Sequence, residues 1–348
     1  MFGVGARMGV VAAVVAGLVS APSAAPAAEC TWPMTPLALP APYTSSSVIA
    51  AAEGGWFVGE ARSATAAPTV RWHGDQVEDI DTPSRRLSEV RDINSSGDVV
   101  GDGGTGDWWS AVPVVHRAGR YENLPVPQGF RSAKATHIDN AGDVVGVAYG
   151  EFATVHPVLW AAARPGTAEV LDPDPQHLYD TYPVDIDEQG RVLLYTDGGD
   201  RSGEVFVRSA DGGYRQLPPL YPGGSVYLEA FHGGRIAASV VTPELTTIAV
   251  EADLDGRIVH TLDEAADTLV VDSGTTMAGV TRTFDPGTYE LRVWDGGELT
   301  ATLAADPDFN AAPRPAALTD DGTLAATIRV PGTSQQRAVA YHRGCGGP

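Results

Sequence analysis

A repeated unit returns along nearly the whole chain at intervals of 40 to 48 residues. Each copy contains an apolar anchor residue, usually an Asn or Asp after it, two polar or small residues, a Gly, and then a short apolar stretch. The clearest copies are Ile93–Gly101 and Ile138–Gly146. The glycines of the seven copies are Gly55, Gly97, Gly142, Gly190, Gly234, Gly274 and Gly322. Seven copies at this period predict an all-β protein, a β-propeller of seven four-stranded blades.

The physical chemistry of the unit explains why it forms a hairpin. An Asn or Asp at the first turn position accepts hydrogen bonds from the backbone ahead of it, and the Gly tolerates the positive φ that closes the turn. A third apolar segment, such as Val158–Trp160, follows each copy, and a second turn, such as Asp211–Gly213, follows that segment in several copies. Strand, turn, strand, loop, strand, turn and strand make up one blade.

Both ends of the chain fit a closed ring. The last copy stops after its third strand, at Tyr341–Gly344, whereas Thr31–Pro40 resembles a fourth strand that has no blade of its own. The N-terminal strand is therefore predicted to complete the last blade. Cys30 and Cys345, the only two cysteines, fall where the turn between these strands would lie, so we predict a disulfide that closes the ring, against the alternative of two free or metal-binding thiols.

The first residues predict export. Arg7 precedes an apolar run, and the small residues that follow end in Ala25–Ala27, an A-x-A cleavage pattern. We therefore expect a signal peptide over 1–27, a single propeller domain over 28–348, and a secreted, extracellular protein. No later segment is long and apolar enough to predict membrane insertion. The 44 acidic against 23 basic residues argue against nucleic acid as a partner, and we expect a monomer.

The repeat resembles that of the HAF-family bacterial extracellular repeat proteins. Ile93-Asn94 with Val99-Val100-Gly101, and Ile138-Asp139 with Val144-Val145-Gly146, carry the resemblance. The His-Ala-Phe triplet of that family is replaced here, for instance by His156-Pro157-Val158. The resemblance implies a repeat-built extracellular protein, and it supports the fold more than any activity.

Charged residues recur beside the apolar anchors of successive innermost strands. They are Asp92, His137, Asp185 and Glu229. If equivalent positions ring one end of the central channel, these side chains converge and form a site for calcium, for another divalent cation or for a polar ligand. The alternative is that they pack between blades or bond to neighbouring backbone.

Trp108 and Trp109 form a second candidate site, for a glycan or a protein. They are adjacent in a Gly-rich loop, where two tryptophans are harder to bury together than one. The alternative is a cap over the core of the blade. Trp72, Trp160 and Trp294 occupy equivalent third-strand positions, and we expect them in the core.

Catalytic motifs are weak. Val270–Thr276 resembles the catalytic loop of pepsin-like aspartic proteases, but that mechanism needs two such loops and the chain has one. Asp272 is therefore assigned to the hairpin of the sixth repeat. The sequence favours a non-enzymatic module that binds an extracellular glycan, protein or cation, or acts as a scaffold. The alternative is a propeller lyase or hydrolase that uses Asp92, His137, Asp185 or Glu229.

Overall fold

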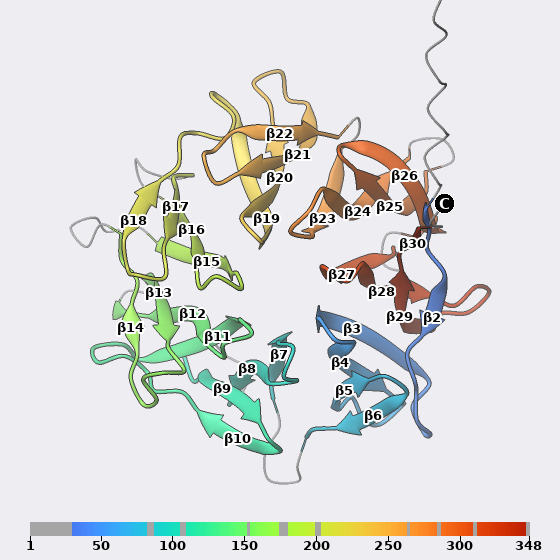
Figure 1. Cartoon of the computed structure of the whole chain (residues 1–348). Coiled ribbons are helices and arrows are strands. Elements are labelled where there is room, and N and C mark those ends of the chain that lie inside the picture. Colours follow the sequence, from blue (N-terminus) through green and yellow to red (C-terminus); the bar gives the residue numbers. More distant parts are fainter. Residues whose placement is uncertain are drawn as a thin grey trace, which may run out of the picture.

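The computed structural model describes residues 30–81, 87–104, 109–151, 154–173, 180–198, 203–262, 265–283, 287–308 and 312–345. The predicted signal peptide, 1–27, lies outside these residues. The described elements are all strands, and they form seven four-stranded antiparallel sheets arranged as blades around a central axis (Figure 1). This arrangement confirms the predicted seven-bladed propeller.

The first three blades each run outward from the axis in chain order. Blade 1 consists of β3 (Ser45–Ala52), β4 (Trp56–Arg62), β5 (Thr69–His73) and β6 (Gln76–Asp79). Blade 2 consists of β7 (Glu89–Ile93), β8 (Val99–Gly103), β9 (Val112–Arg117) and β10 (Arg120–Asn123). Blade 3 consists of β11 (Ser132–Ile138), β12 (Val144–Tyr149), β13 (Val155–Trp160) and β14 (Glu169–Val170).

The next three blades repeat the same strand order. Blade 4 consists of β15 (Asp180–Ile186), β16 (Val192–Asp197), β17 (Val205–Arg208) and β18 (Tyr214–Gln216). Blade 5 consists of β19 (Ser225–His232), β20 (Arg235–Val241), β21 (Thr247–Asp253) and β22 (Ile258–Thr261). Blade 6 consists of β23 (Ala266–Val271), β24 (Thr276–Arg282), β25 (Tyr289–Asp295) and β26 (Glu298–Asp306).

Blade 7 is built from both ends of the chain. It consists of β27 (Arg314–Leu318), β28 (Thr323–Arg329), β29 (Gln336–His342) and the N-terminal strand β2 (Met34–Pro36). A short pair, β1 (Cys30–Thr31) with β30 (Gly344–Cys345), carries the Cys30–Cys345 disulfide. The closure of the ring by an N-terminal strand and by this disulfide is therefore confirmed.

The turn chemistry is as the repeat predicts. In blade 2, Oδ1 of Asn94 accepts hydrogen bonds from the N–H groups of Ser96 and Asp98, and Gly97 has a φ of +75°. A Cβ atom on Gly97 would also lie 2.8 Å from the ring of Trp56 in blade 1. Glycine is thus required both for the turn and for the contact between neighbouring blades.

Asp272 performs the same turn function in blade 6. Its Oδ1 accepts hydrogen bonds from the N–H groups of Gly274 and Thr276, both at 2.9 Å. The structure thus gives Asp272 the hairpin position that the repeat assigns to it.

The core lies within and between the blades, and the third-strand tryptophans belong to it. Trp72, Trp160 and Trp294 are all buried. The indole N–H of Trp72 donates to the carbonyl of Ala38, and that of Trp160 donates to the carbonyl of Pro125. The rings of Trp72 and Trp160 therefore pack inside their blades while backbone carbonyls satisfy their indole N–H groups. Within the described residues, no helix has the length and apolarity needed to span a membrane.

Candidate functional site

A cavity of about 230 Å³ lies at one end of the central channel. Residues from the innermost strand of every blade line it, namely from β3, β7, β11, β15, β19, β23 and β27. Its charged lining is mostly acidic, comprising Glu53, Asp92, Asp185, Glu188 and Glu229 against Arg91. Such a lining favours a cation and disfavours an anion.

A β-bulge in each innermost strand determines which side chain faces this cavity. The pairing register shifts between Val90 and Asp92 in blade 2, and at the equivalent place in the other blades. The residue that follows the bulge lines the cavity in every blade. In chain order these residues are Ala50, Asp92, His137, Asp185, Ala230, Val270 and Ala317. Polar residues thus occupy this position only in blades 2, 3 and 4.

Glu229 does not share this position, which corrects the predicted alignment. It lies at the bulge itself, and Ala230 follows it. Phe231, which is fully buried, takes the place of the apolar anchor, because the larger side chain fills the interior better than Ala230 does. Glu229 still lines the cavity, and its Oε1 lies 3.3 Å from the Ser239 hydroxyl, which donates to it.

The other three predicted residues converge. His137 Nδ1 lies 3.3 Å from Asp185 Oδ1 and 3.9 Å from Asp92 Oδ2. One potential ligand atom from each of Asp92, His137 and Asp185 lies within 4.8 Å of the others. Their side chains keep 19%, 31% and 29% exposure, so they remain accessible from the channel.

Backbone hydrogen bonds hold the two carboxylates in place. Asp92 Oδ1 accepts from the N–H of Ile93 at 2.8 Å, and its Oδ2 accepts from the N–H of Ile138 in the next blade at 2.9 Å. Asp185 Oδ1 accepts from the N–H of Ile186 at 2.7 Å. Asp92 therefore joins blades 2 and 3 as well as lining the cavity, so the structural alternative also holds for this residue.

Burial shifts the pKa values of all three groups away from their ordinary range. It raises the pKa of Asp92 to about 7, against the opposing effect of the two backbone hydrogen bonds. Burial and the neighbouring Asp92 charge raise the pKa of Asp185 well above its usual value. Burial lowers the pKa of His137 to about 4, so its imidazole is neutral at pH 7 and can offer a lone pair.

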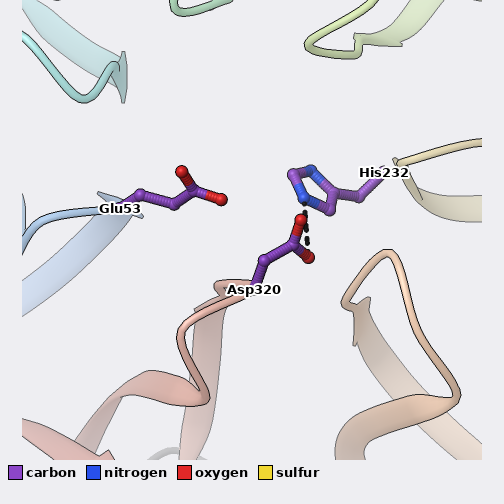
Figure 2. Close-up of side chains that lie close together, drawn as sticks. All are labelled: Glu53, His232 and Asp320. Atoms are coloured by element: carbon purple, nitrogen blue, oxygen red, sulfur yellow. Dashed lines mark ion pairs between the residues drawn. The ribbon is translucent and has the colours of Figure 1, made fainter.

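A second cluster, which the sequence reasoning missed, lies at the turns of the same channel end. Glu53, His232 and Asp320 come from the first hairpins of blades 1, 5 and 7, and Figure 2 shows their side chains pointing toward one another. His232 Nε2 lies 3.2 Å from Asp320 Oδ1. A signal for two of them was present, because Glu53 and Asp320 both stand two residues after the apolar anchor of their repeats.

A second hollow, of about 550 Å³, lies between blades 7, 1, 2 and 3. It shares Arg91 and His137 with the first cavity and is also lined by Arg62 and Arg314. Its lining includes the acids Glu60 and Glu89, which form ion pairs with Arg62 and Arg91, so this hollow is less acidic than the first cavity.

The predicted aromatic site is only partly within the described structure. Trp109 is 53% exposed, and the guanidinium carbon of Arg131 lies 5.8 Å from the centre of its ring. Trp108 lies outside the described residues. Trp109 is therefore not buried as a cap over the blade core.

Comparison with known proteins supports the propeller fold, and it assigns no family or activity. No family model matches the chain, and no curated protein matches it either. Among solved structures it is similar to prolyl oligopeptidase B from Galerina marginata as the apo protein, with a TM-score of 0.55, 12% identity and coverage of 89% of this chain and 51% of that one. The complex of that protein with a 35mer hydrolysis and macrocyclization substrate gives a TM-score of 0.57, 11% identity and coverage of 92% and 49%. This chain thus spans about half the length of those proteins, and the similarity shows the propeller fold alone.

Proposed function

We propose that this protein is an extracellular binding propeller whose channel holds a divalent metal ion at Asp92, His137 and Asp185. The observation that carries the proposal is the convergence of these three side chains within 4.8 Å in an accessible, acidic cavity. The signal-peptide pattern over 1–27 and the resemblance to HAF-family repeats support the extracellular location.

The ring itself provides an argument that these residues serve binding. The equivalent position in blades 1, 5, 6 and 7 is Ala50, Ala230, Val270 and Ala317, so a blade of this propeller forms without a polar residue there. Two half-buried carboxylates side by side oppose folding unless a proton or a cation neutralises them. A metal ion would neutralise both.

The donor set favours zinc or manganese over calcium. Calcium is bound by six to eight oxygen ligands, whereas a neutral imidazole with two carboxylates is typical of zinc and related transition metals. Calcium, the ion predicted from the sequence, therefore serves as the comparison ion in the test.

The test is isothermal titration of EDTA-stripped, desalted protein with Zn²⁺, Mn²⁺ and Ca²⁺, together with thermal unfolding. An ion that binds only the folded state raises the melting temperature. We expect the Asp185→Asn variant to weaken binding at this site at least 10-fold, because it removes a charged ligand and leaves the Asp92 link between blades intact. Glu122→Gln, an exposed acid on β10, is the matched control. Equal affinity in wild type and Asp185→Asn would refute the proposal.

One observation favours the enzymatic alternative, a lyase or hydrolase. His137 Nδ1 lies 3.9 Å from Asp92 Oδ2, and burial raises the pKa of Asp92 to about 7 and lowers that of His137 to about 4, so a carboxylic acid and a neutral imidazole stand together, as general acid–base catalysis requires. Turnover of a glycan panel by wild type, and its loss in Asp185→Asn, would establish this function. No turnover with the metal bound would leave binding as the function.

A further inference from the structure

We infer that Glu53, His232 and Asp320 form a second metal site, of the zinc type, which ties blade 5 to blades 7 and 1 across the mouth of the channel. The inference goes beyond the proposed function, because the three ligands differ from those of the first site and come from other blades. Its consequence is also different, since this ion would hold the turns of non-adjacent blades together.

Equivalent turns deliver two of the ligands. Glu53 and Asp320 each stand two residues after the apolar anchor, Ala51 in blade 1 and Leu318 in blade 7. Blades 7 and 1 are neighbours at the ring closure, so their turns lie side by side (Figure 1). The site therefore takes one carboxylate from each side of that closure.

The third ligand comes from a turn of different length. His232 directly follows the anchor Phe231, and the turn of blade 5 is one residue shorter than the turn of blade 2. Figure 2 shows the imidazole facing both carboxylates. Gly233 makes this placement possible, because a Cβ atom there would lie 2.2 Å from Ser273 Cβ in the turn of blade 6.

The environment of His232 suits a metal ligand. Its Nε2 is shielded from solvent and makes no hydrogen bond with the described residues, although it lies 3.2 Å from Asp320 Oδ1. A shielded polar atom without a hydrogen bond is unfavourable, and coordination of a metal ion would satisfy it. Asp320 is already oriented, because its Oδ1 accepts a hydrogen bond from the N–H of Ser273 at 2.8 Å.

The ligand chemistry fits zinc. One imidazole nitrogen and two carboxylate oxygens, each from a different blade, place potential ligand atoms within 4.8 Å of one another. Zinc accepts this set of ligands and completes its tetrahedron with water. The two carboxylates balance the charge of a divalent ion, so no further charged group is required.

The experiment counts zinc sites in the EDTA-stripped, desalted full-length protein by isothermal titration. It also records Co²⁺ absorption, which reports the coordination geometry. His232→Gln keeps a polar side chain of similar size but removes the imidazole. We expect it to remove one binding event, or to weaken that event at least 10-fold, and to reduce the zinc-induced rise in melting temperature. His73→Gln, at an exposed histidine of blade 1, is the matched control.

The two proposals fail in different ways. The Glu53→Gln variant is expected to give the same loss as His232→Gln, whereas Asp185→Asn should leave this second event unchanged. Equal melting temperatures of wild type and His232→Gln in EDTA would show that the variant is folded. If neither His232→Gln nor Glu53→Gln alters zinc binding, or if the wild type binds no zinc, the second site does not exist. A zinc event lost only in Asp185→Asn would leave the first proposal standing and overturn this one.

Discussion

Neighbouring blades meet along contacts that we call seams, and two of these seams are held together by different kinds of hydrogen bond. Between blades 2 and 3, a carboxylate forms the link, because Asp92 Oδ2 accepts a hydrogen bond from the N–H of Ile138. Between blades 7 and 1, where the ring closes, the hydroxyl of Thr327 accepts from the N–H of Val48 at 3.0 Å. Blade 7 also contains the N-terminal strand β2, and the Cys30–Cys345 disulfide joins the short pair β1 and β30 next to it in the chain.

The difference between the two seams shows that contact between blades does not require a charged side chain, whereas a cation site does. Both seams satisfy a backbone N–H with a side-chain oxygen, but only one of them uses a group that can carry charge. A hydroxyl performs this task at the closure without the desolvation cost of an ionised carboxylate. The charge in blades 2 to 4 is therefore more than the seams require, and a bound cation would account for it.

The largest loss of stability is expected from removing the disulfide that joins the two ends of the chain. Replacing both cysteines with serine frees the two ends of the chain, and loop-entropy arguments put the loss of stability at up to roughly 5 kcal/mol for a bridge that spans most of a chain. Urea unfolding of the variant and of wild type would measure it. Reduction of the wild type should reproduce the loss, and an unchanged midpoint would show that β2 holds blade 7 closed without the bridge.

The second prediction compares the two seams directly. At pH 5 and in EDTA, Asp92→Ala and Thr327→Val should each cost about 1–3 kcal/mol, because the first removes the acceptor of the Ile93 and Ile138 N–H groups and the second removes the acceptor of the Val48 N–H. The two costs should diverge as the pH rises. The pKa of Asp92 is raised to about 7 from an ordinary value of 3.8, so the folded wild type loses stability between pH 4 and about 7, as the carboxyl ionises more readily in the unfolded chain.

The cost of Asp92→Ala should therefore shrink toward pH 8, because the variant lacks the group that is unfavourable when ionised. The cost of Thr327→Val should stay constant, because threonine does not titrate. Unfolding free energies at pH 5, 6, 7 and 8 would show this divergence. Parallel curves for the two variants would mean that Asp92 is ionised without penalty, and the contrast between the seams would then disappear.

The fold, the ring closure and most of the first candidate site could be predicted from the sequence. The period, the fourth strand from the N-terminus and the disulfide follow from one repeat, because repeats of one length fold into one kind of blade. The convergence of Asp92, His137 and Asp185 also follows, since adjacent blades present equivalent positions to one axis. Glu229 was misplaced because Ala230 and Phe231 are both apolar, and only packing shows which of them is the anchor.

The second cluster could not be predicted in the same way. Glu53 and Asp320 hold matching turn positions, but their blades are joined by the ring closure and lie far apart in the chain. His232 is displaced from that position by the shorter turn of blade 5. A site assembled across the mouth from turns of unequal length breaks the repeat symmetry, and only the three-dimensional arrangement brings its residues together.

The smallest effect on stability is expected at Trp109, which tests whether the channel is the only functional region. The side chain is half exposed, so Trp109→Ala should change the unfolding free energy by about 0.5 kcal/mol or less. It should leave zinc titration unchanged, because Trp109 does not line either channel cavity. A glycan array with wild type and variant would test the alternative, since exposed aromatic rings stack on sugars. Loss of a glycan signal in Trp109→Ala, with zinc binding intact, would place a second function on the loop between β8 and β9 of blade 2, outside the channel.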